Sequence, residues 1–383
     1  MLWTSEIEIS KSALEHNFQF IKNRLGKNVQ FSSVVKGNAY GHGIEVFVPL
    51  AENCGVNHFS VFSADEALRV QKSTLTNPTI LIMGMLDNNQ LEWAIKNGIE
   101  FFIFELDRLK QTVFTAKRVG IPAKVHIEVE TGMNRTGFSK KEIPEVMNLL
   151  KQNMGNLEFK GLCTHFAGAE SIANFHRIKS QKGVYRRVQN RFINNGLTPQ
   201  ICHTACSAAM LRYPKTQMDL VRVGILQYGF FPNREALIYY LAKQKELEFP
   251  LERLISWKSK VMSMKVVKAG EFVGYGTSFL ANTEMKIATI PIGYSHGFSR
   301  SLSNRGRVLI RGFRVSVVGN VNMNMMCVDV TNVGNVEKGD EVVLIGRQGD
   351  LEISVASFSE NSTQLNYELL TRLPGDIPRK IVS

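Results

Sequence analysis

Short apolar runs alternate with amphipathic segments along the first two-thirds of the chain. Eight runs rich in β-branched and aromatic residues predict strands at residues 31–36, 58–62, 79–83, 100–104, 123–129, 159–165, 200–204 and 219–223. Helical spacing predicts helices at residues 11–24, 44–52, 64–71, 89–95, 108–119, 141–152 and 175–194. Alternating strands and helices predict parallel pairing. The count of eight favours a (β/α)8 barrel of the TIM type, an α/β fold, over a doubly wound open sheet.

The pattern changes after residue 245. Short strand-like runs follow at residues 257–267, 286–290, 307–310, 315–318, 326–330 and 341–345, separated by Gly and Asn and without a long helical pattern between them. Short strand-like runs without helices between them predict a mostly-β domain. We therefore expect two domains, residues 1–245 and 246–383, with the boundary at residues 250–253.

Composition narrows the class of protein. The chain has 383 residues, of which 44% are hydrophobic, so two domains with sizeable cores can form. No apolar run reaches the roughly 18 residues that span a bilayer, and the first residues lack the layout of a signal peptide. The five cysteines include no Cys-x-x-Cys pair. We expect a cytoplasmic protein without a metal site or membrane contact.

The formal net charge is +12, which favours anionic partners. Lysine and arginine are scattered and are not interleaved with aromatic residues as in a nucleic-acid platform. A phosphorylated small molecule therefore fits this charge better than a nucleic acid does.

Lys36 ends the first predicted barrel strand, within the string VVKGNAYGHG. In this barrel fold the active site lies at the carboxyl ends of the strands. A lysine that leaves an apolar strand is partly desolvated, which lowers its pKa and frees the amine as a nucleophile or Schiff-base partner. A lysine that merely extends to water from a strand end is the structural alternative.

The same string closely resembles the cofactor-lysine signature of alanine racemases, and further matches follow in order along nearly the whole chain. The resemblance implies a fold-type III enzyme that depends on pyridoxal 5′-phosphate (PLP), with a (β/α)8 barrel followed by a β-domain. It implies that Lys36 carries the cofactor and that the Tyr40 hydroxyl binds its phosphate. The implied reaction interconverts L- and D-alanine. In a bacterium this isomerase would supply D-alanine for peptidoglycan precursors.

Further barrel motifs resemble those of the family. The string TGMNRTG implies that Arg135 lies beside the phenolic oxygen of the cofactor, a charge-assisted pair, and close to the substrate. The string THFA implies that His165 orients a catalytic tyrosine or the arginine below the ring. His203 is expected to pack near the cofactor ring. Ser207 matches a phosphate-binding serine, and a serine with the amides that enter a helix forms a phosphate cradle.

The string VRVGI ends the last predicted barrel strand and also matches the family. The match implies that the backbone amides of Gly224 and Ile225 bind the phosphate and that Arg222 faces the pyridine nitrogen. Arginine stays charged and only donates, so the nitrogen would stay unprotonated. An unprotonated ring is a weaker electron sink, which would suppress side reactions such as transamination.

The predicted β-domain carries the remaining matches. The string VGYGT resembles the segment that holds the second base of the family, here Tyr275. A free tyrosine has a pKa near 10, and His165 and Arg222 are the candidates that would lower its proton affinity. The resemblance implies a homodimer in which Tyr275 comes from the partner subunit. Lys36 and Tyr275 would then act on opposite faces of the substrate Cα.

Two loops of this domain match segments around the substrate. The string PIGYSHG implies that Tyr294 helps form the substrate entrance across the dimer interface. The string VGNVNMN implies that the backbone amide of Met323 holds the substrate carboxylate, with Asn324 beside it.

Several positions depart from the family pattern. Glu128 stands where many members have a lysine, often carbamylated, that steadies the arginine matching Arg135. We hypothesise that the Glu128 carboxylate replaces that carbamate. Asn324 and His296 stand at usual aspartates, and the position of a late tyrosine near the phosphate falls at Gly375. Loss of that ring would either widen the pocket, which would admit larger side chains, or weaken phosphate binding.

Other functions remain open from the sequence. A broader racemase acting on serine, lysine or similar amino acids is the nearest alternative. A fold-type III decarboxylase is disfavoured by Arg222 and by the domain order. A non-catalytic PLP-binding protein is disfavoured by the β-domain with Tyr275, since such proteins are usually the barrel alone.

Overall fold

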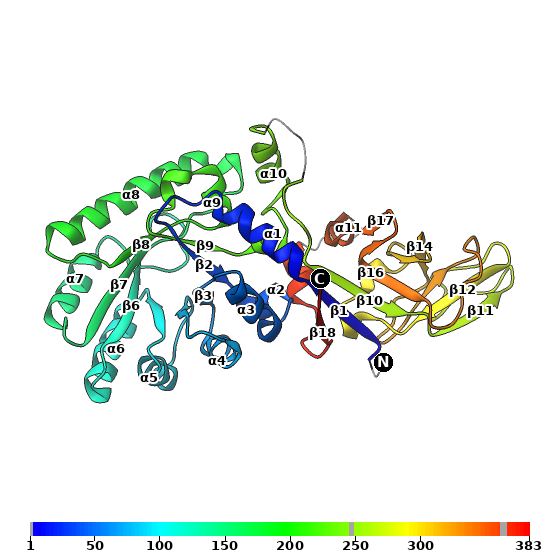
Figure 1. The fold of residues 1–383 in the computed structure, drawn as a ribbon, viewed down its shortest axis with the longest axis horizontal. Helices are drawn as coiled ribbons and strands as arrows, with labels where there is room; N and C mark the ends of the chain where they lie inside the picture. The colour runs from blue at the N-terminus through cyan, green and yellow to red at the C-terminus, as the bar shows by residue number, and fades with distance from the viewer. Residues whose placement is uncertain (1–2, 245–248, 361–365) are drawn as a thin grey trace. The chain divides into compact units, whose positions relative to one another are not determined.

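The structure is a computed structural model that describes residues 3–244, 249–360 and 366–383 (Figure 1). The chain forms two compact units. The barrel unit comprises Leu14–Lys36 and Phe47–Glu252, and the β-unit comprises Met1–Ala13, Gly37–Val46 and Arg253–Ser383. The β-unit thus takes in the first segment of the chain and a short stretch after Lys36. The limits 1–245 and 246–383 for two sequential domains stay a prediction.

Eight parallel strands form the sheet of the barrel unit, in the order β8-β7-β6-β5-β4-β3-β2-β9. Their bounds are β2 Gln30–Val34, β3 His58–Val61, β4 Thr79–Ile82, β5 Glu100–Ile103, β6 Ala123–Glu128, β7 Leu157–Cys163, β8 Ile201–His203 and β9 Leu220–Val223. A bridge between Cys206 and Arg222 nearly closes the ring between β8 and β9. A strand order that follows the chain confirms the predicted barrel and excludes the doubly wound sheet, whose order reverses.

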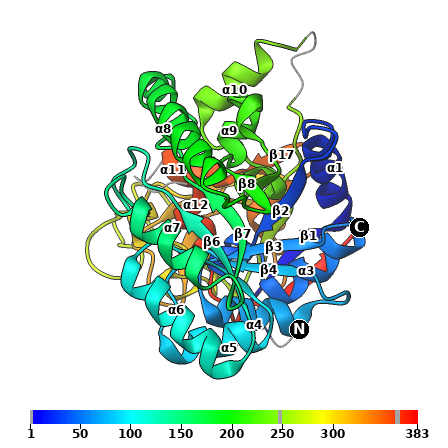
Figure 2. The same cartoon turned by 90° about the vertical axis from the view of Figure 1, so that its left-hand side faces the viewer.

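Helices cover the outside of these strands (Figures 1 and 2). Their bounds are α1 Lys11–Lys22, α3 Ile44–Asn53, α4 Ala64–Ser73, α5 Asn88–Lys96, α6 Leu106–Val119, α7 Ile143–Gln152, α8 Phe175–Asn194, α9 Ser207–Arg212 and α10 Arg234–Leu241. Strands β3, β5 and β9 are buried along their whole length. Burial on both faces explains why apolar residues occupy successive positions in these strands, as at residues 101–103 and 220–221.

The turn that follows β2, labelled α2 (Lys36–Tyr40), is left-handed. Gly37, Asn38, Ala39 and Tyr40 have φ values of 63°, 55°, 52° and 51°. This conformation costs an L-residue about 1–2 kcal/mol, so the turn persists only because its surroundings hold it. Gly41 follows with a φ of 83°, and a Cβ there would lie 1.9 Å from the carbonyl oxygen of Leu370. Glycine alone fits that approach.

One mixed sheet dominates the β-unit, in the order β11-β12-β15-β14-β13-β16-β10-β1-β18, with β17 paired to β16. The bounds are β1 Ser5–Ser10, β10 Ile255–Lys260, β11 Ser263–Val267, β12 Met285–Ile290, β13 Arg307–Ile310, β14 Phe313–Val318, β15 Met326–Asp329, β16 Glu341–Gln348, β17 Leu351–Ile353 and β18 Arg379–Val382. Helices α11 (Val355–Glu360) and α12 (Asn366–Thr371) complete the unit. The mostly-β prediction is confirmed.

The predicted run 257–267 is two strands, because the chain changes partners within it. Strand β10 pairs with β1 and β16, whereas β11 pairs with β12. Strands β1 and β18 were not predicted. Within the described part of the chain, no helix has the length and apolar character needed to cross a membrane.

Candidate active site

Hydrogen bonds to backbone groups of Val34 and Val35 hold the end of β2 in place beside Lys36. The carbonyl oxygen of Val34 accepts from Gln227 Nε2 at 2.8 Å and from Tyr228 Oη at 3.0 Å. The amide of Val35 donates to the carbonyl oxygen of Ser60 at 2.9 Å. Lys36 therefore leaves the barrel from a fixed point at the carboxyl end of its strand, as predicted.

The surroundings of Lys36 favour a neutral amine. The residue is exposed, but enough protein surrounds the amine that loss of hydration lowers its pKa. The positive charges of Arg135 and Arg222 lower this pKa further, and Glu66 and Cys206 oppose them. A larger neutral fraction makes Lys36 a better nucleophile and base than an ordinary surface lysine.

A carboxylate shapes the turn that carries Arg135. Glu130 accepts hydrogen bonds from the backbone amides of Gly132, of Met133 at 2.8 Å and of Asn134 at 2.9 Å. Asn134 has a φ of 57°, so the turn needs this support. The turn carries Arg135, an exposed residue whose positive charge lowers the pKa of Lys36.

Glu128 and His165 respond to the same positive charges. Burial raises the pKa of the Glu128 carboxyl, while Thr136, Arg222 and Arg135 oppose this rise. Burial lowers the pKa of His165 to about 3, helped by Arg222, Arg135 and Lys36. The His165 imidazole is therefore neutral at ordinary pH, and both arginines favour the charged form of Glu128.

Ser207 lies where the ends of β8 and β9 meet. Its Oγ accepts from the backbone amide of Gly224 at 3.0 Å, and both residues are buried. The amide of Arg222 donates to the carbonyl oxygen of Ala205 at 3.0 Å, which ties the two strand ends together. Buried amide and hydroxyl donors next to Arg222 form a site suited to an anion.

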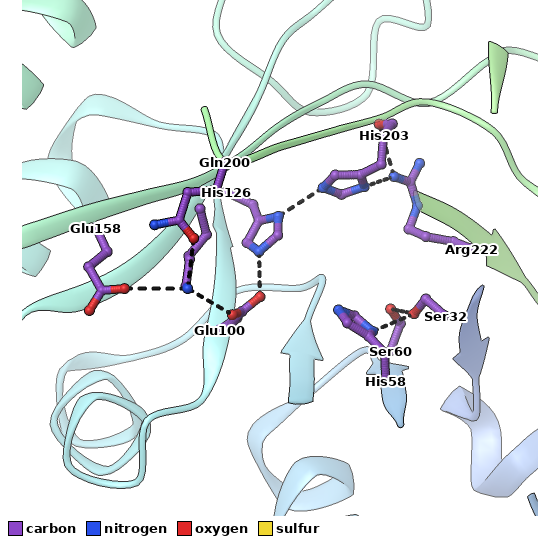
Figure 3. Close-up of polar contacts among 10 residues, drawn as sticks. Ser32, His58, Ser60, Glu100, His126, Glu158, Gln200, His203 and Arg222 are labelled. Atoms are coloured by element: carbon purple, nitrogen blue, oxygen red, sulfur yellow. Dashed lines mark hydrogen bonds and ion pairs between the residues drawn. The ribbon is translucent and has the colours of Figure 1, made fainter. Parts of the chain in front are cut away.

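The Arg222 guanidinium is buried and makes contacts on two sides. Nη2 donates to the carbonyl oxygen of Thr164 at 2.9 Å, and Nη1 donates to Nδ1 of His203 (Figure 3). His203 in turn contacts His126, so its ring lies inside the barrel. Sequence reasoning expected His203 near the cofactor ring and did not foresee its bond to Arg222.

The predicted residues of the β-unit lie on two parts of that unit. Tyr40 belongs to the left-handed turn, is buried, and has its ring centroid 5.9 Å from that of Tyr367. Tyr275 lies in the loop between β11 and β12 with its side chain 75% exposed. Its carbonyl oxygen accepts from Asn320 Nδ2 at 2.9 Å.

The loops with the other predicted residues pack on one another. The amide of Tyr294 donates to the carbonyl oxygen of Asn322 at 3.0 Å. Ser295 Oγ donates to the carbonyl oxygen of Met323 at 2.7 Å and to Oδ1 of Asn324 at 2.8 Å. Together with the bond from Asn320 to Tyr275, these contacts bring the strings VGYGT, PIGYSHG and VGNVNMN to one place on the β-unit. The side chains of Tyr275, Tyr294 and Met323 are exposed there.

Two family models match nearly the whole chain. The N-terminal domain of alanine racemase matches residues 9–232, and the C-terminal domain of alanine racemase matches residues 254–381. The chain belongs to the alanine racemase family. Members of this family are isomerases, so the predicted enzyme class is confirmed.

Individual relatives agree with this assignment. Alanine racemase 1 of Caldanaerobacter subterraneus subsp. tengcongensis is 33% identical over 375 residues, which are 98% of this chain and 94% of the relative. The structure of alanine racemase from Clostridium difficile 630 matches with a TM-score of 0.91 and 28% identity, over 100% of this chain and 96% of that one. Alanine racemase from Bartonella henselae, solved with covalently bound pyridoxal phosphate, has a TM-score of 0.85 and 25% identity, over 99% and 100%.

The barrel unit of this family member brings together most of the predicted site. The charges of Arg135 and Arg222 lower the pKa of both Lys36 and His165, and Ser207 Oγ accepts from the Gly224 amide. Ile225 is buried next to Gly224. Sequence reasoning missed Glu130 and the two residues Glu100 and His126. A carboxylate just before a glycine-containing turn was the available signal for Glu130.

Proposed function

We propose that this protein interconverts L- and D-alanine with pyridoxal 5′-phosphate, using Lys36 and Tyr275 as two bases. The observation that carries the proposal is the amine of Lys36, whose pKa is lowered at the carboxyl end of a barrel strand beside Arg135 and Arg222. Membership of the alanine racemase family supports the reaction.

The residues of the barrel unit fit this cofactor. Lys36 supplies the amine that an aldehyde requires, and the buried Ser207 hydroxyl and Gly224 amide supply donors for a phosphate. Arg135 and Arg222 supply positive charge for the phenolic oxygen and a donor for the ring nitrogen. We extend the phosphate site to Ile225 and to the Tyr40 hydroxyl. The Bartonella henselae relative, solved with covalently bound pyridoxal phosphate, supports this choice.

When bound, PLP supplies an electron sink that makes the substrate Cα–H acidic. Residues of the chain then remove this Cα proton from one face and return a proton on the other. Nζ of Lys36 takes or gives the proton on one face of Cα, and Oη of Tyr275 does so on the other. We expect the neutral His165 and the charged Arg222 to lower the proton affinity of the phenol. Arg135, the Met323 amide, Asn324 and Tyr294 orient the substrate.

Tyr275 would come from a second copy of the chain. Its side chain is 75% exposed, as a group that completes the site of another subunit must be. We therefore propose a homodimer with shared sites, formed in the cytoplasm. In a bacterium its product would serve peptidoglycan precursors.

A chiral product screen tests the function. The protein is incubated with PLP and each common L-amino acid, and chiral chromatography measures the D-enantiomer. We expect D-alanine to form, and we expect Lys36→Ala to lose both this product and the borohydride-reducible cofactor. Lys179→Ala, on the exposed face of α8, is the matched control. Wild-type protein that retains PLP but racemises no amino acid refutes the proposal.

Tyr275→Phe tests the second base. Removal of a general base should lower the rate about 10²–10⁴-fold. The enantiomers have equal free energy, so kcat/KM must fall equally in both directions. The asymmetry appears in the Cα-deuterium isotope effect, which should grow for one enantiomer only. Tyr239→Phe is the control. Equal isotope effects with undiminished rates would exclude Tyr275 as a base.

A broader substrate range is the second candidate. A Cβ added at Gly375 would meet no atom within 4 Å among the described residues. Gly375 stands where the family pattern has a late tyrosine, and a pocket without that ring would favour side chains larger than methyl. Discrimination by one methylene amounts to about 1–3 kcal/mol, so the same screen should include serine and lysine.

A further inference from the structure

Four buried polar side chains form a line across the interior of the barrel (Figure 3). Glu100 is the first residue of β5, His126 lies in β6, His203 is the last residue of β8, and Arg222 lies in β9. Glu100 Oε2 is 2.8 Å from His126 Nε2, and His126 Nδ1 is 2.8 Å from His203 Nε2. His203 Nδ1 then meets Nη1 of Arg222. We call these four residues the buried polar network.

The chemistry of the two ends allows one arrangement of protons. Arginine only donates, so Nδ1 of His203 must accept. A neutral His203 then carries its proton on Nε2 and donates it to Nδ1 of His126. His126 in turn carries its proton on Nε2 and donates it to the Glu100 carboxylate, which only accepts. Every bond in the network points from Arg222 towards Glu100.

Burial makes this arrangement stable and the loss of any member costly. His126 and His203 are fully buried, and Glu100 and Arg222 are 7% and 5% exposed. Burial lowers the pKa of both histidines, so they are neutral. Burial would raise the pKa of Glu100, but the bond from His126 and nearby positive groups outweigh it and lower this pKa. A buried guanidinium and a buried carboxylate are thus joined through two neutral rings.

A glycine leaves room for the central ring. Gly161 of β7 lies opposite His126 in the sheet register. A Cβ at Gly161 would lie 2.0 Å from Nδ1 of His126, so any other residue would displace the ring. The absence of a side chain at Gly161 therefore allows the His126 ring to reach His203, and it is a second observation beside the hydrogen bond itself.

We propose that Glu100, His126 and His203 are positioning residues for Arg222. Their line of hydrogen bonds polarises towards Glu100 and makes His203 Nδ1 a strong acceptor. Nη1 is then committed to His203 and Nη2 to the Thr164 carbonyl, which fixes the plane of the guanidinium. Arg222 keeps its charge and one orientation towards the site that faces Lys36. This role rests on the proposed function, in which Arg222 faces the pyridine nitrogen.

The outer end of the network supplies a matched control. Lys160 Nζ lies 4.0 Å from Glu100 Oε1 and 3.5 Å from Glu158 Oε2. Glu158 shares this lysine but, within the described part of the chain, makes no hydrogen bond to either histidine. Glu158→Gln therefore removes a carboxylate near Lys160 without interrupting the network, and Glu100→Gln and Glu100→Leu act on the network itself.

Nitrogen NMR of histidine-labelled protein tests the proton arrangement, with and without PLP. We expect His126 and His203 to be neutral Nε2–H tautomers near neutral pH. Glu100→Gln should keep them, because its amide oxygen still accepts from His126. Glu100→Leu should alter the His126 signal, whereas Glu158→Gln should not. An Nδ1–H tautomer or a charged ring at either position in the wild type overturns the proposal, whatever the protein catalyses.

A kinetic test uses two kinds of variant on the holoenzyme. Glu100→Leu removes the acceptor, and Gly161→Ala displaces His126 without removing any polar group. Both should lower kcat about tenfold with little change in KM, the size typical of losing a group that orients a ligand. Both should also shift the signal of nitrogen-labelled pyridine in bound PLP. Gly155→Ala, where a Cβ meets nothing within 4 Å, is the control.

The outcomes separate this inference from the proposed function. If the wild type racemises no amino acid, the proposed function fails, while the NMR result still decides the proton arrangement. If the wild type racemises alanine and folded Glu100→Leu and Gly161→Ala keep its kcat and pyridine signal, the positioning role is overturned and the function stands. Recovery of activity in Glu100→Gln but not in Glu100→Leu supports the role.

Discussion

Ser207→Ala removes a hydroxyl that makes a hydrogen bond within the protein, independently of any bound ligand. Ser207 Oγ accepts from the Gly224 amide at 3.0 Å, and the amide is buried. Without that oxygen the amide loses its acceptor, which costs about 1–3 kcal/mol of the free energy of unfolding of the cofactor-free protein. A hydrogen bond to a charged group contributes about 1.5–3 kcal/mol, so loss of the hydroxyl should also weaken PLP binding about 10–100-fold.

Two measurements check this prediction. Urea unfolding followed by circular dichroism gives the change in stability of the cofactor-free protein, and absorbance titration of PLP gives its dissociation constant. Ser180→Ala is the matched control, because Ser180 is exposed on α8. A loss of stability with unchanged PLP affinity would show that Ser207 is structural only. No change in either quantity would refute the reasoning from the Gly224 bond.

Three further predictions concern pH, backbone and charge. Burial lowers the pKa of His58 to about 4 from 6.5, so the unfolded chain binds an extra proton between these values. The folded protein therefore has its full stability above pH 6.5 and loses up to about 3 kcal/mol of its free energy of unfolding as the pH falls towards 4. Urea unfolding measured at a series of pH values should show this loss, and the free energy of unfolding should depend less steeply on pH in His58→Asn. Gly41→Ala should destabilise the fold by about 3 kcal/mol or more in thermal unfolding, because its Cβ would lie 1.9 Å from a carbonyl oxygen, whereas Gly334→Ala should change stability by less than about 0.5 kcal/mol. Glu128→Gln should lower the racemisation rate about tenfold and change the cofactor absorption band; unchanged activity and spectrum would reject the idea that this carboxylate replaces a carbamate.

The sequence was sufficient for the barrel because its strands are buried on both faces. These runs are mainly apolar, as at residues 100–104, where four of the five residues are apolar, and eight of them in series leave few other folds. Strand β1 was harder to recognise, although Ser5–Ser10 alternates between buried and half-buried positions. Its partners β10 and β18 are far from it in sequence, and no local pattern reveals such pairing.

Site residues that stand in a recognisable motif could be predicted from the sequence. Residues that meet only because the chain folds could not. Lys36, Arg135 and Arg222 stand in strings that resemble those of a known family. Glu100 and His126 belong to no recognisable motif, and their contact exists only because the barrel brings β5 and β6 together. A charged residue in a strand that is otherwise apolar is nonetheless a usable signal, since burying it requires a partner.

The position of β1 has a consequence for how the protein is made. Ile7 pairs with Trp257 on one side and with Arg379 on the other, so β1 is an inner strand of its sheet. During synthesis this strand leaves the ribosome before either neighbour exists, and its backbone groups stay unpaired while the barrel segments are translated. Strand β1 is thus made before both of its neighbours and can pair only after they have been translated. Chaperone demand and aggregation during expression should therefore depend on the first ten residues more strongly than on any surface loop.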